Sequence, residues 1–235
     1  GRVLWKRTFD SLDNFGVYFD KTYNDTPLST GYNQVHIPGA NGRGTNYIAT
    51  EKEIFVILGS HCEVLDARTG ATKRQISMPS REPDRMPPLW GFIGIYEEIL
   101  LGGLGFANYS GEKGNQASRR ELAILDMSAS DGLVGFDRET GRVRWQADSR
   151  FSFLHNGIVA GGGRVYCLDK LPGSVEAGLR RRGLSRDQKY RLAALDVRTG
   201  ELLWERETDI FGTWLGYSEE YDVLLQAGAL AGDRL

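Results

Sequence analysis

Three aspartates, Asp66, Asp137 and Asp196, each open the short pattern Asp-x-x-Thr-Gly. Carboxylates can act as general bases in catalysis. In this pattern, however, the carboxylate is placed to accept backbone N–H groups of a tight hairpin, and the glycine supplies the positive φ that such a turn needs. We therefore expect these aspartates to be used by their turns, and the sequence predicts no catalytic residue.

Tryptophan completes the pattern. The full form, Asp-x-x-Thr-Gly-x-x-x-Trp, occurs from Asp137 to Trp145 and from Asp196 to Trp204. A third copy has Arg74 in place of tryptophan, and residues 1–5 read as the end of a further copy, so the chain is expected to start inside a repeat. Each tryptophan is expected to pack against the next repeat. The predicted structural residues are Trp5, Asp66, Thr69, Gly70, Asp137, Thr140, Gly141, Trp145, Asp196, Thr199, Gly200 and Trp204.

The segments around the turns predict strands. Apolar runs separated by polar or glycine turns precede the aspartates, as in residues 48–58 and 159–168. Together with the strands that flank each turn they give units of four short antiparallel strands, which is typical of a β-propeller blade. We predict an all-β propeller, or a fragment of one, as a single domain over residues 1–235. Its expected parts are whole blades at 44–76, 89–147 and 154–206, partial blades at 1–6 and 213–235, and insertions at 108–129 and 171–190.

The repeat resembles the pyrroloquinoline quinone-type propeller repeat, which is found in quinoprotein dehydrogenases and in outer-membrane assembly lipoproteins of the Bam type. The resemblance rests on the turn-plus-tryptophan copies and covers nearly the whole chain, apart from the insertions and the stretch after Lys6. It implies a fold and no particular activity. In members that bind the quinone, the cofactor lies over one mouth of the central funnel, where loops at the ends of the inner strands reach it.

A candidate ligand site follows from that resemblance. Aligning the copies places Thr45, Trp90, Asn156 and Trp214 just before the innermost strands, with His155 beside Asn156. Two tryptophans, an amide and a histidine from successive blades could stack on and hydrogen-bond a flat polar ligand. The alternative is that both tryptophans plug the funnel and that His155 is a satisfied histidine at a strand end.

Other reactive residues give weaker signals. Cys62 and Cys167 lie in different predicted blades and are expected to be buried free thiols. No Cys/His spacing resembles a zinc site, so no metal is expected. The insertion at 171–190 carries a basic cluster that could bind phosphate or an acidic partner, although a solvated loop or short helix explains it more simply. The cluster consists of Arg180, Arg181, Arg182, Arg186 and Lys189.

Charge and hydropathy exclude some partners. The formal net charge of -2 gives no reason to expect nucleic acid, and no apolar run is long enough to span a bilayer. Three whole units and two partial ones leave blade edges that need a partner. The remaining blades of a longer chain, a separate protein, or a second copy in a homodimer could cover them.

Two classes of function remain open. The first is a non-catalytic propeller that serves as a binding or scaffold platform without a cofactor. The alternative is a fragment of a quinone-dependent dehydrogenase that would bind pyrroloquinoline quinone with calcium, or an accessory propeller fused to a catalytic domain such as a kinase or a methyltransferase. The sequence leaves the compartment open, and the family resemblance implies a periplasmic or extracellular location.

Overall fold

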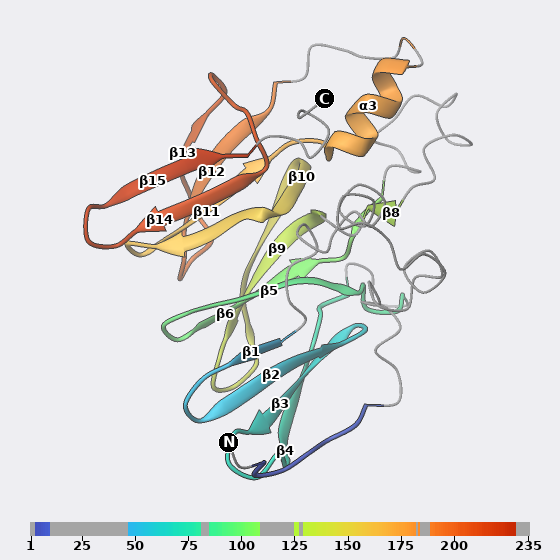
Figure 1. The fold of residues 1–235 in the computed structure, drawn as a ribbon, viewed down its shortest axis with the longest axis vertical. Coiled ribbons are helices and arrows are strands. Elements are labelled where there is room, and N and C mark those ends of the chain that lie inside the picture. Colours follow the sequence, from blue (N-terminus) through green and yellow to red (C-terminus); the bar gives the residue numbers. More distant parts are fainter. Residues whose placement is uncertain are drawn as a thin grey trace.

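The computed structural model describes residues 3–9, 47–80, 85–108, 125–126, 129–181, 183 and 189–228. Within these residues the chain is almost entirely antiparallel β-sheet, and its one helix is α3 (Gly173–Arg181). The all-β fold predicted from the sequence is therefore confirmed. The sheets follow one another as a fan from the N-terminal to the C-terminal end (Figure 1).

The first sheet contains four strands in chain order. They are β1 (Tyr47–Ala49), β2 (Glu53–Leu58), β3 (His61–Asp66) and β4 (Thr72–Ser77). The central strand β2 (EIFVIL) is a nearly continuous apolar run, and consecutive residues in the middle of both β2 and β3 are buried because both faces of these strands are covered. Residues 3–9 run along this sheet, where Arg7 donates a hydrogen bond to Glu63 at 2.7 Å.

The second sheet contains seven strands in the order β13–β12–β11–β10–β9–β6–β5. They are β5 (Trp90–Tyr96), β6 (Ile99–Leu104), β9 (Ala129–Asp137), β10 (Val143–Gly161), β11 (Arg164–Asp169), β12 (Arg191–Asp196) and β13 (Leu202–Arg206). The 19-residue strand β10 pairs with β9 mainly through its first part and with β11 mainly through its second, with a register shift between Asp148 and Phe153. One strand thus joins the segments predicted as the blades 89–147 and 154–206.

Two short hairpins complete the fold. β14 (Trp214–Ser218) pairs with β15 (Val223–Ala227), and β7 (Ala107–Asn108) pairs with β8 (Leu125–Asp126). Helix α3 lies in the predicted insertion 171–190, whereas most of the predicted insertion 108–129 falls outside the described residues.

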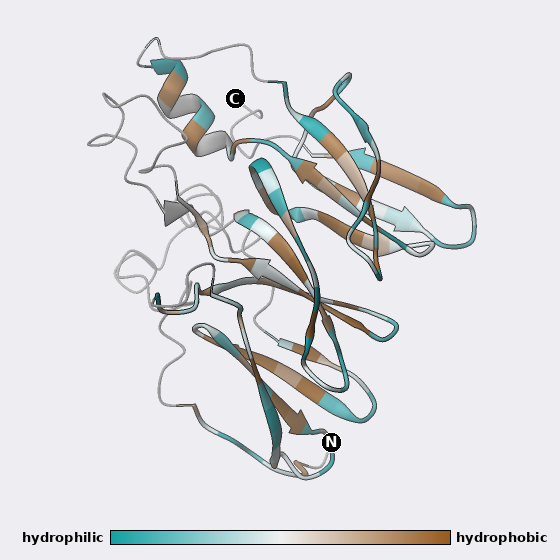
Figure 2. Cartoon of the chain, turned by 180° about the vertical axis from the view of Figure 1, so that it is seen from behind, coloured by the Kyte–Doolittle hydropathy of each residue, from teal (hydrophilic) through white to brown (hydrophobic). Residues whose placement is uncertain are grey.

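The core lies between successive sheets. Strands β1, β5, β10 and β14 contact one another in that order, so one strand of each unit lies beside its counterpart in the next. One buried apolar cluster joins the first sheet to β5, β6 and β9, and another lies within the seven-stranded sheet. Figure 2 shows that hydrophobic residues are concentrated in the strands. Because each sheet buries its faces against its neighbours, the packing is of the nearest-neighbour kind seen in repeat proteins.

Candidate functional site

Each turn aspartate caps its own hairpin. Asp66 accepts hydrogen bonds from the N–H and the hydroxyl of Thr69, both at 2.9 Å, and Asp137 accepts the same pair from Thr140, both at 2.8 Å. Asp196 accepts the corresponding backbone N–H at 2.9 Å. The Thr69 hydroxyl lowers the pKa of Asp66, and backbone N–H groups of the turn lower the pKa of Asp196. These carboxylates therefore serve their turns.

The tryptophan of one copy lies on the turn of the next. Trp5 donates from Nε1 to the carbonyl of Ala67 at 3.0 Å, and Trp145 donates to the carbonyl of Val197 at 2.9 Å. Both acceptors directly follow a turn aspartate. The indole also covers the turn glycine, since a Cβ on Gly200 would lie 2.6 Å from the Trp145 ring. The junction thus needs glycine for space as well as for its positive φ.

Arg74 makes the same junction without an indole. Its Nη2 donates to the carbonyl of Arg138 at 2.7 Å, and Arg138 is again the residue after a turn aspartate. Ile76 covers Gly141 in place of the ring. Glu53 holds the guanidinium by two hydrogen bonds, at 2.7 and 3.2 Å, and this pairing lowers the pKa of Glu53 to about 2. The Arg74 copy is therefore a variant of the tryptophan junction.

Trp204 occupies the same strand register as Trp145, but one face of its indole ring is open to solvent. It pairs with Ala194 of the preceding strand just as Trp145 pairs with Gly135. Its side chain is 41% exposed, whereas that of Trp145 is 6% exposed. In the described part of the chain no turn glycine lies on the ring of Trp204, and its aromatic neighbour is Tyr166, with the centroids 5.9 Å apart.

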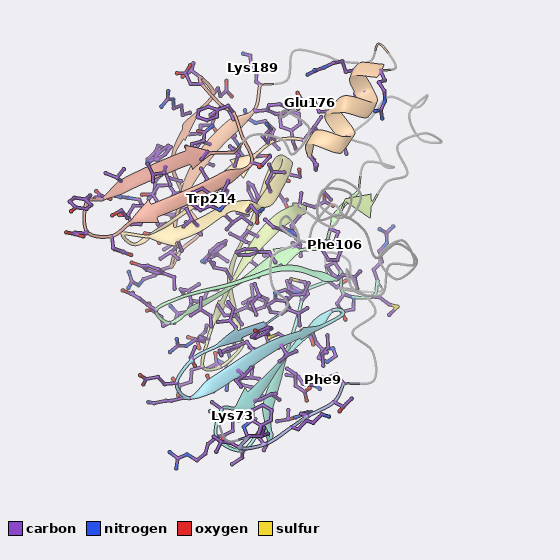
Figure 3. All side chains as sticks on the ribbon, in the orientation of Figure 1. Phe9, Lys73, Phe106, Glu176, Lys189 and Trp214 are labelled. Carbon is purple, nitrogen blue, oxygen red and sulfur yellow. The ribbon has the colours of Figure 1, made fainter. Side chains whose placement is uncertain are left out.

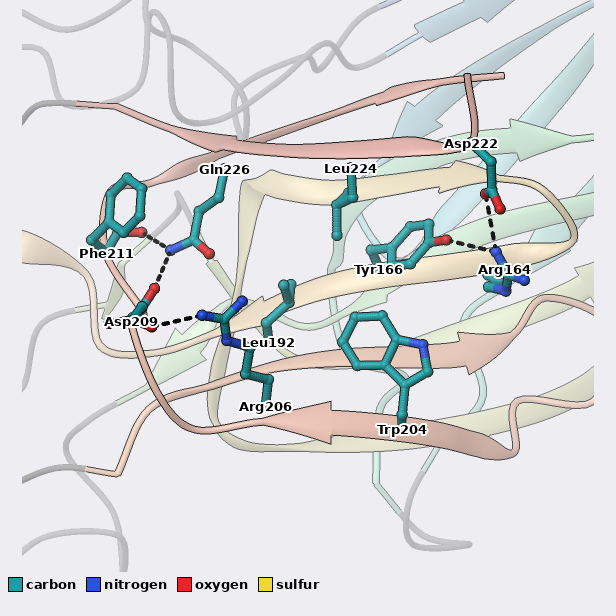
Figure 4. A pocket seen from close by; sticks show the side chains of 10 residues that line it. All are labelled: Arg164, Tyr166, Leu192, Trp204, Arg206, Asp209, Phe211, Asp222, Leu224 and Gln226. Atoms are coloured by element: carbon teal, nitrogen blue, oxygen red, sulfur yellow. Dashed lines mark hydrogen bonds and ion pairs between the residues drawn. The ribbon is translucent and has the colours of Figure 1, made fainter. Parts of the chain in front are cut away.

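A cavity of about 530 Å³ opens beside Trp204. It lies between the sheet face of β11, β12 and β13 and the β14–β15 hairpin (Figure 4). Tyr166 and Leu192 line its sheet side together with Trp204, and Leu224 faces them from β15. The middle of the cavity is therefore largely apolar.

Paired charges lie at the two ends of the cavity (Figure 4). At one end Arg206 contacts Asp209 at 2.7 Å, and at the other Arg164 contacts Asp222 at 3.2 Å. Asp222 also accepts the hydroxyl of Tyr217, which raises the pKa of Tyr217 to about 12. An apolar centre with a polar rim is the usual composition of a surface that binds another polypeptide.

Two of the five residues expected at the funnel mouth, Trp90 and His155, lie in the core. Trp90 is fully buried and stacks on Phe136 at 5.0 Å, so it has no open face for a flat ligand. His155 is buried and its Nε2 lies 2.8 Å from the hydroxyl oxygen of Ser130. These two residues do not fit a stacking site for a quinone.

The structure describes two of the other three members of the predicted ring. Asn156 is half-buried next to His155, and Thr45 lies outside the described residues. Trp214 begins β14 in the end hairpin (Figure 3), is 48% exposed, and covers Gly216 of its own strand. The ligand-binding role of these residues stays a prediction.

The cysteines are buried and free. Burial raises the pKa of Cys62 to about 12 and also raises that of Cys167, so both thiols stay protonated at neutral pH. Within the described ranges, no three His, Cys, Asp or Glu side chains are grouped so that they could hold a metal ion. No described helix has the length and apolar character needed to cross a membrane.

The predicted basic cluster is described only in part. Arg180 and Arg181 lie in the last turn of α3, where positive charge suits the helix dipole. Lys189 follows the helix in an exposed segment, and Arg182 and Arg186 lie outside the described residues. The described members show no shared site.

The cavity beside Trp204 was missed by sequence reasoning, which treated Trp204 as a purely structural residue. Tyr166, Leu192 and Phe211, which line the cavity, carry no pattern of their own.

Hairpin turns that join successive antiparallel sheets through a docked side chain define the class of pyrroloquinoline quinone-like β-propeller repeat proteins. A family model described as the outer membrane protein assembly factor BamB matches residues 60–213, and the chain belongs to this family. No curated protein matched the sequence.

Solved structures with a similar fold are distant. BamB from Moraxella catarrhalis is 14% identical, with 68% of this chain and 35% of that chain covered and a TM-score of 0.37. Quinohemoprotein alcohol dehydrogenase from Comamonas testosteroni is 13% identical, with 68% and 26% covered and a TM-score of 0.45. The chain thus spans about a third of the first structure and a quarter of the second, and these likenesses concern the fold alone.

Proposed function

We propose that this chain is a non-catalytic β-propeller platform that binds a polypeptide through its C-terminal end. The observation that carries the proposal is the group of large apolar side chains that stay exposed on β13, on β15 and in the segment between them. They are Leu202, Leu203, Trp204, Phe211, Val223 and Leu225. Of these, Trp204 and Phe211 line the cavity together with Leu224, and large exposed apolar side chains beside polar ones mark interaction surfaces in soluble proteins.

The roles of the polar residues support a platform rather than a catalyst. Asp66, Asp137 and Asp196 are occupied by their turns, and His155 is buried against Ser130. Catalytic acids and bases need access to a substrate and a pKa suited to proton transfer. The accessible chemistry of the described surface is that of aromatic, aliphatic and paired charged groups, which favours binding.

Family membership supports the same proposal. The family description names a protein that takes part in the assembly of outer membrane proteins. For this chain we propose a protein partner, in the form of further blades, a separate protein or a second copy, and a periplasmic or extracellular location. No cofactor is part of the proposed function.

A photo-crosslinking amino acid in place of Phe211 tests the platform in cells of the source organism. Phe211 lines the cavity and is exposed, and Met86, which is even more exposed and does not line the cavity, is the control position. We expect a discrete crosslinked product from position 211 and none from position 86. Equal crosslinking at both positions, or none at either, would refute the proposal.

Cofactor addition tests the competing enzymatic reading. A ligand that binds the folded state raises the unfolding temperature. We expect the purified protein to show no shift on addition of pyrroloquinoline quinone with calcium, and no quinone-dependent reduction of a dye. A saturable shift in unfolding temperature together with dye reduction would refute the platform proposal and support an enzymatic function.

A further inference from the structure

Lys170 directly follows β11 and is partly exposed, yet it has no ion-pair partner among the described residues. Its Nζ donates a hydrogen bond to the carbonyl of Gly212 at 3.2 Å and lies 5.3 Å from the centre of the Tyr190 ring. The neighbouring carboxylate of Asp169 is occupied, because it accepts three backbone N–H groups of β10 and a hydrogen bond from Arg191. Asp169 therefore leaves the charge of Lys170 unpaired.

The aromatic ring beside this amine belongs to an apolar cluster. Phe151 meets the Tyr190 ring edge-on, with the ring centres 5.3 Å apart, and both rings pack against a buried cluster that includes Val175 of α3. The hydroxyl of Tyr190 is buried without a hydrogen-bond partner among the described groups, so few polar groups surround the ring. Burial lowers the pKa of Lys170, and the smaller effect of the Glu176 carboxylate opposes this shift.

An amine in apolar surroundings is a better nucleophile, because a lowered pKa leaves more of it neutral near pH 7. The other described lysines lack such an environment. Lys73 pairs with Glu53 at 2.6 Å, and Lys6, Lys52 and Lys189 are exposed. Among the lysines that the structure describes, Lys170 is therefore the one best placed to attack an electrophile.

We propose that Lys170 is a capture site for a small neutral aldehyde, which it binds covalently and reversibly as an imine. The free amine of Nζ attacks the carbonyl carbon and forms a C–N bond. The carbonyl oxygen then leaves as water with the two hydrogens of the amine, and the C–N bond becomes a C=N double bond. The step needs no oxidant, reductant or further co-reactant. The neutral imine nitrogen carries no hydrogen, so the hydrogen bond to Gly212 is given up.

The groups around Lys170 define the class of aldehyde. Glu176 lies on α3 (Figure 3), and its carboxylate acts electrostatically on the amine. An aldehyde that carries its own carboxylate would be repelled by Glu176, so a neutral molecule is favoured. The Tyr190 ring next to the amine offers an apolar surface, which suits an aromatic aldehyde such as benzaldehyde.

Competitive labelling of the purified protein tests the capture site. Benzaldehyde is added together with sodium cyanoborohydride, which reduces the imine to a stable benzylamine, and peptide mass spectrometry follows each lysine at neutral pH. We expect Lys170 to react about fivefold or more faster than Lys52, and this advantage should disappear in denaturing urea. With para-carboxybenzaldehyde the advantage of Lys170 over Lys52 should shrink by about threefold or more.

Two variants of the apolar wall serve as matched controls. Tyr190→Phe keeps the ring and should keep the rapid reaction of Lys170. Tyr190→Ala opens the wall to water and should lower the rate at Lys170 to that at Lys52, with circular dichroism as the check that the fold is intact. Loss of the rapid reaction in Tyr190→Phe would contradict the role given to the ring.

The capture site is overturned if Lys170 in the folded protein reacts no faster than Lys52. It is also overturned if the advantage of Lys170 persists in urea, or if both aldehydes show the same advantage. The outcome is independent of the proposed platform, since Lys170 does not line the cavity beside Trp204.

Discussion

Replacing Trp145 by alanine should destabilise the protein far more than the same change at Trp204. The two residues hold the same register in successive copies, but Trp145 is 6% exposed and Trp204 is 41% exposed. Trp145 also donates a hydrogen bond to Val197 at 2.9 Å and lies directly on Gly200. Comparing the two variants therefore measures how much the turn that covers Trp145 contributes to the free energy of unfolding.

The expected magnitudes follow from burial. A tryptophan buries roughly 150–250 Å², which at about 25 cal/mol/Å² corresponds to about 4–6 kcal/mol as an upper limit. Alanine at Trp145 also leaves a void and an unpaired carbonyl, so we expect a cost of about 3–5 kcal/mol in the free energy of unfolding. Trp204 borders an open cavity, where truncation leaves no enclosed void, and we expect about 1–2 kcal/mol.

Equilibrium urea unfolding followed by far-ultraviolet circular dichroism measures both costs without relying on tryptophan fluorescence. Trp145→Phe serves as a control that keeps an aromatic ring and loses the indole N–H, and its cost should fall between those of the two alanine variants. A Trp204→Ala variant as destabilised as Trp145→Ala would refute the view that the tryptophan of one copy is stabilised by the turn of the next.

Two further predictions concern the same junctions. Gly200→Ala should lower the free energy of unfolding by about 2–4 kcal/mol, because a Cβ at this position meets the overlying indole. Gly163 has nearly the same positive φ but no atom within 4 Å among the described residues, so Gly163→Ala should lower it by only about 1–2 kcal/mol. Thermal unfolding of both variants checks this, and equal losses would contradict it. Arg74 lowers the pKa of Glu53 to about 2, so the ionised pair stabilises the fold above the ordinary pKa of 4.5 and this contribution is lost as the pH falls from there towards 2. Arg74→Met should remove about 1–2 kcal/mol of this pH-dependent stability, as read from urea unfolding between pH 3 and pH 7, and an unchanged profile would count against the pair.

The fold class could be predicted because its signals are local. The turn needs a carboxylate, a hydroxyl and a glycine within five consecutive residues, so it can be recognised as a short sequence motif, as at Asp137–Gly141. Alternating apolar runs on either side then predict antiparallel strands. The same reasoning identified the family, since the motif copies carried the resemblance that the family match confirmed.

The candidate site could not be predicted in the same way. Alignment of the copies places Trp90 and Asn156, with His155 beside it, just before equivalent strands, but whether such a residue faces solvent depends on how neighbouring strands pack. Phe136 covers Trp90 from another strand of its sheet, and Ser130 lies against His155 from β9. The continuity of strand β10 could not be predicted either, because no residue pattern in its sequence indicates that two predicted blades share one strand.

In this protein the residues that pack together at a junction do not come from a single copy of the sequence repeat. Each copy ends in a side chain that contacts the turn of the next copy, so every junction is built from residues of two copies. Arg74 shows what this side chain must provide, namely an N–H group for the carbonyl after the aspartate and cover for the glycine, here with help from Ile76.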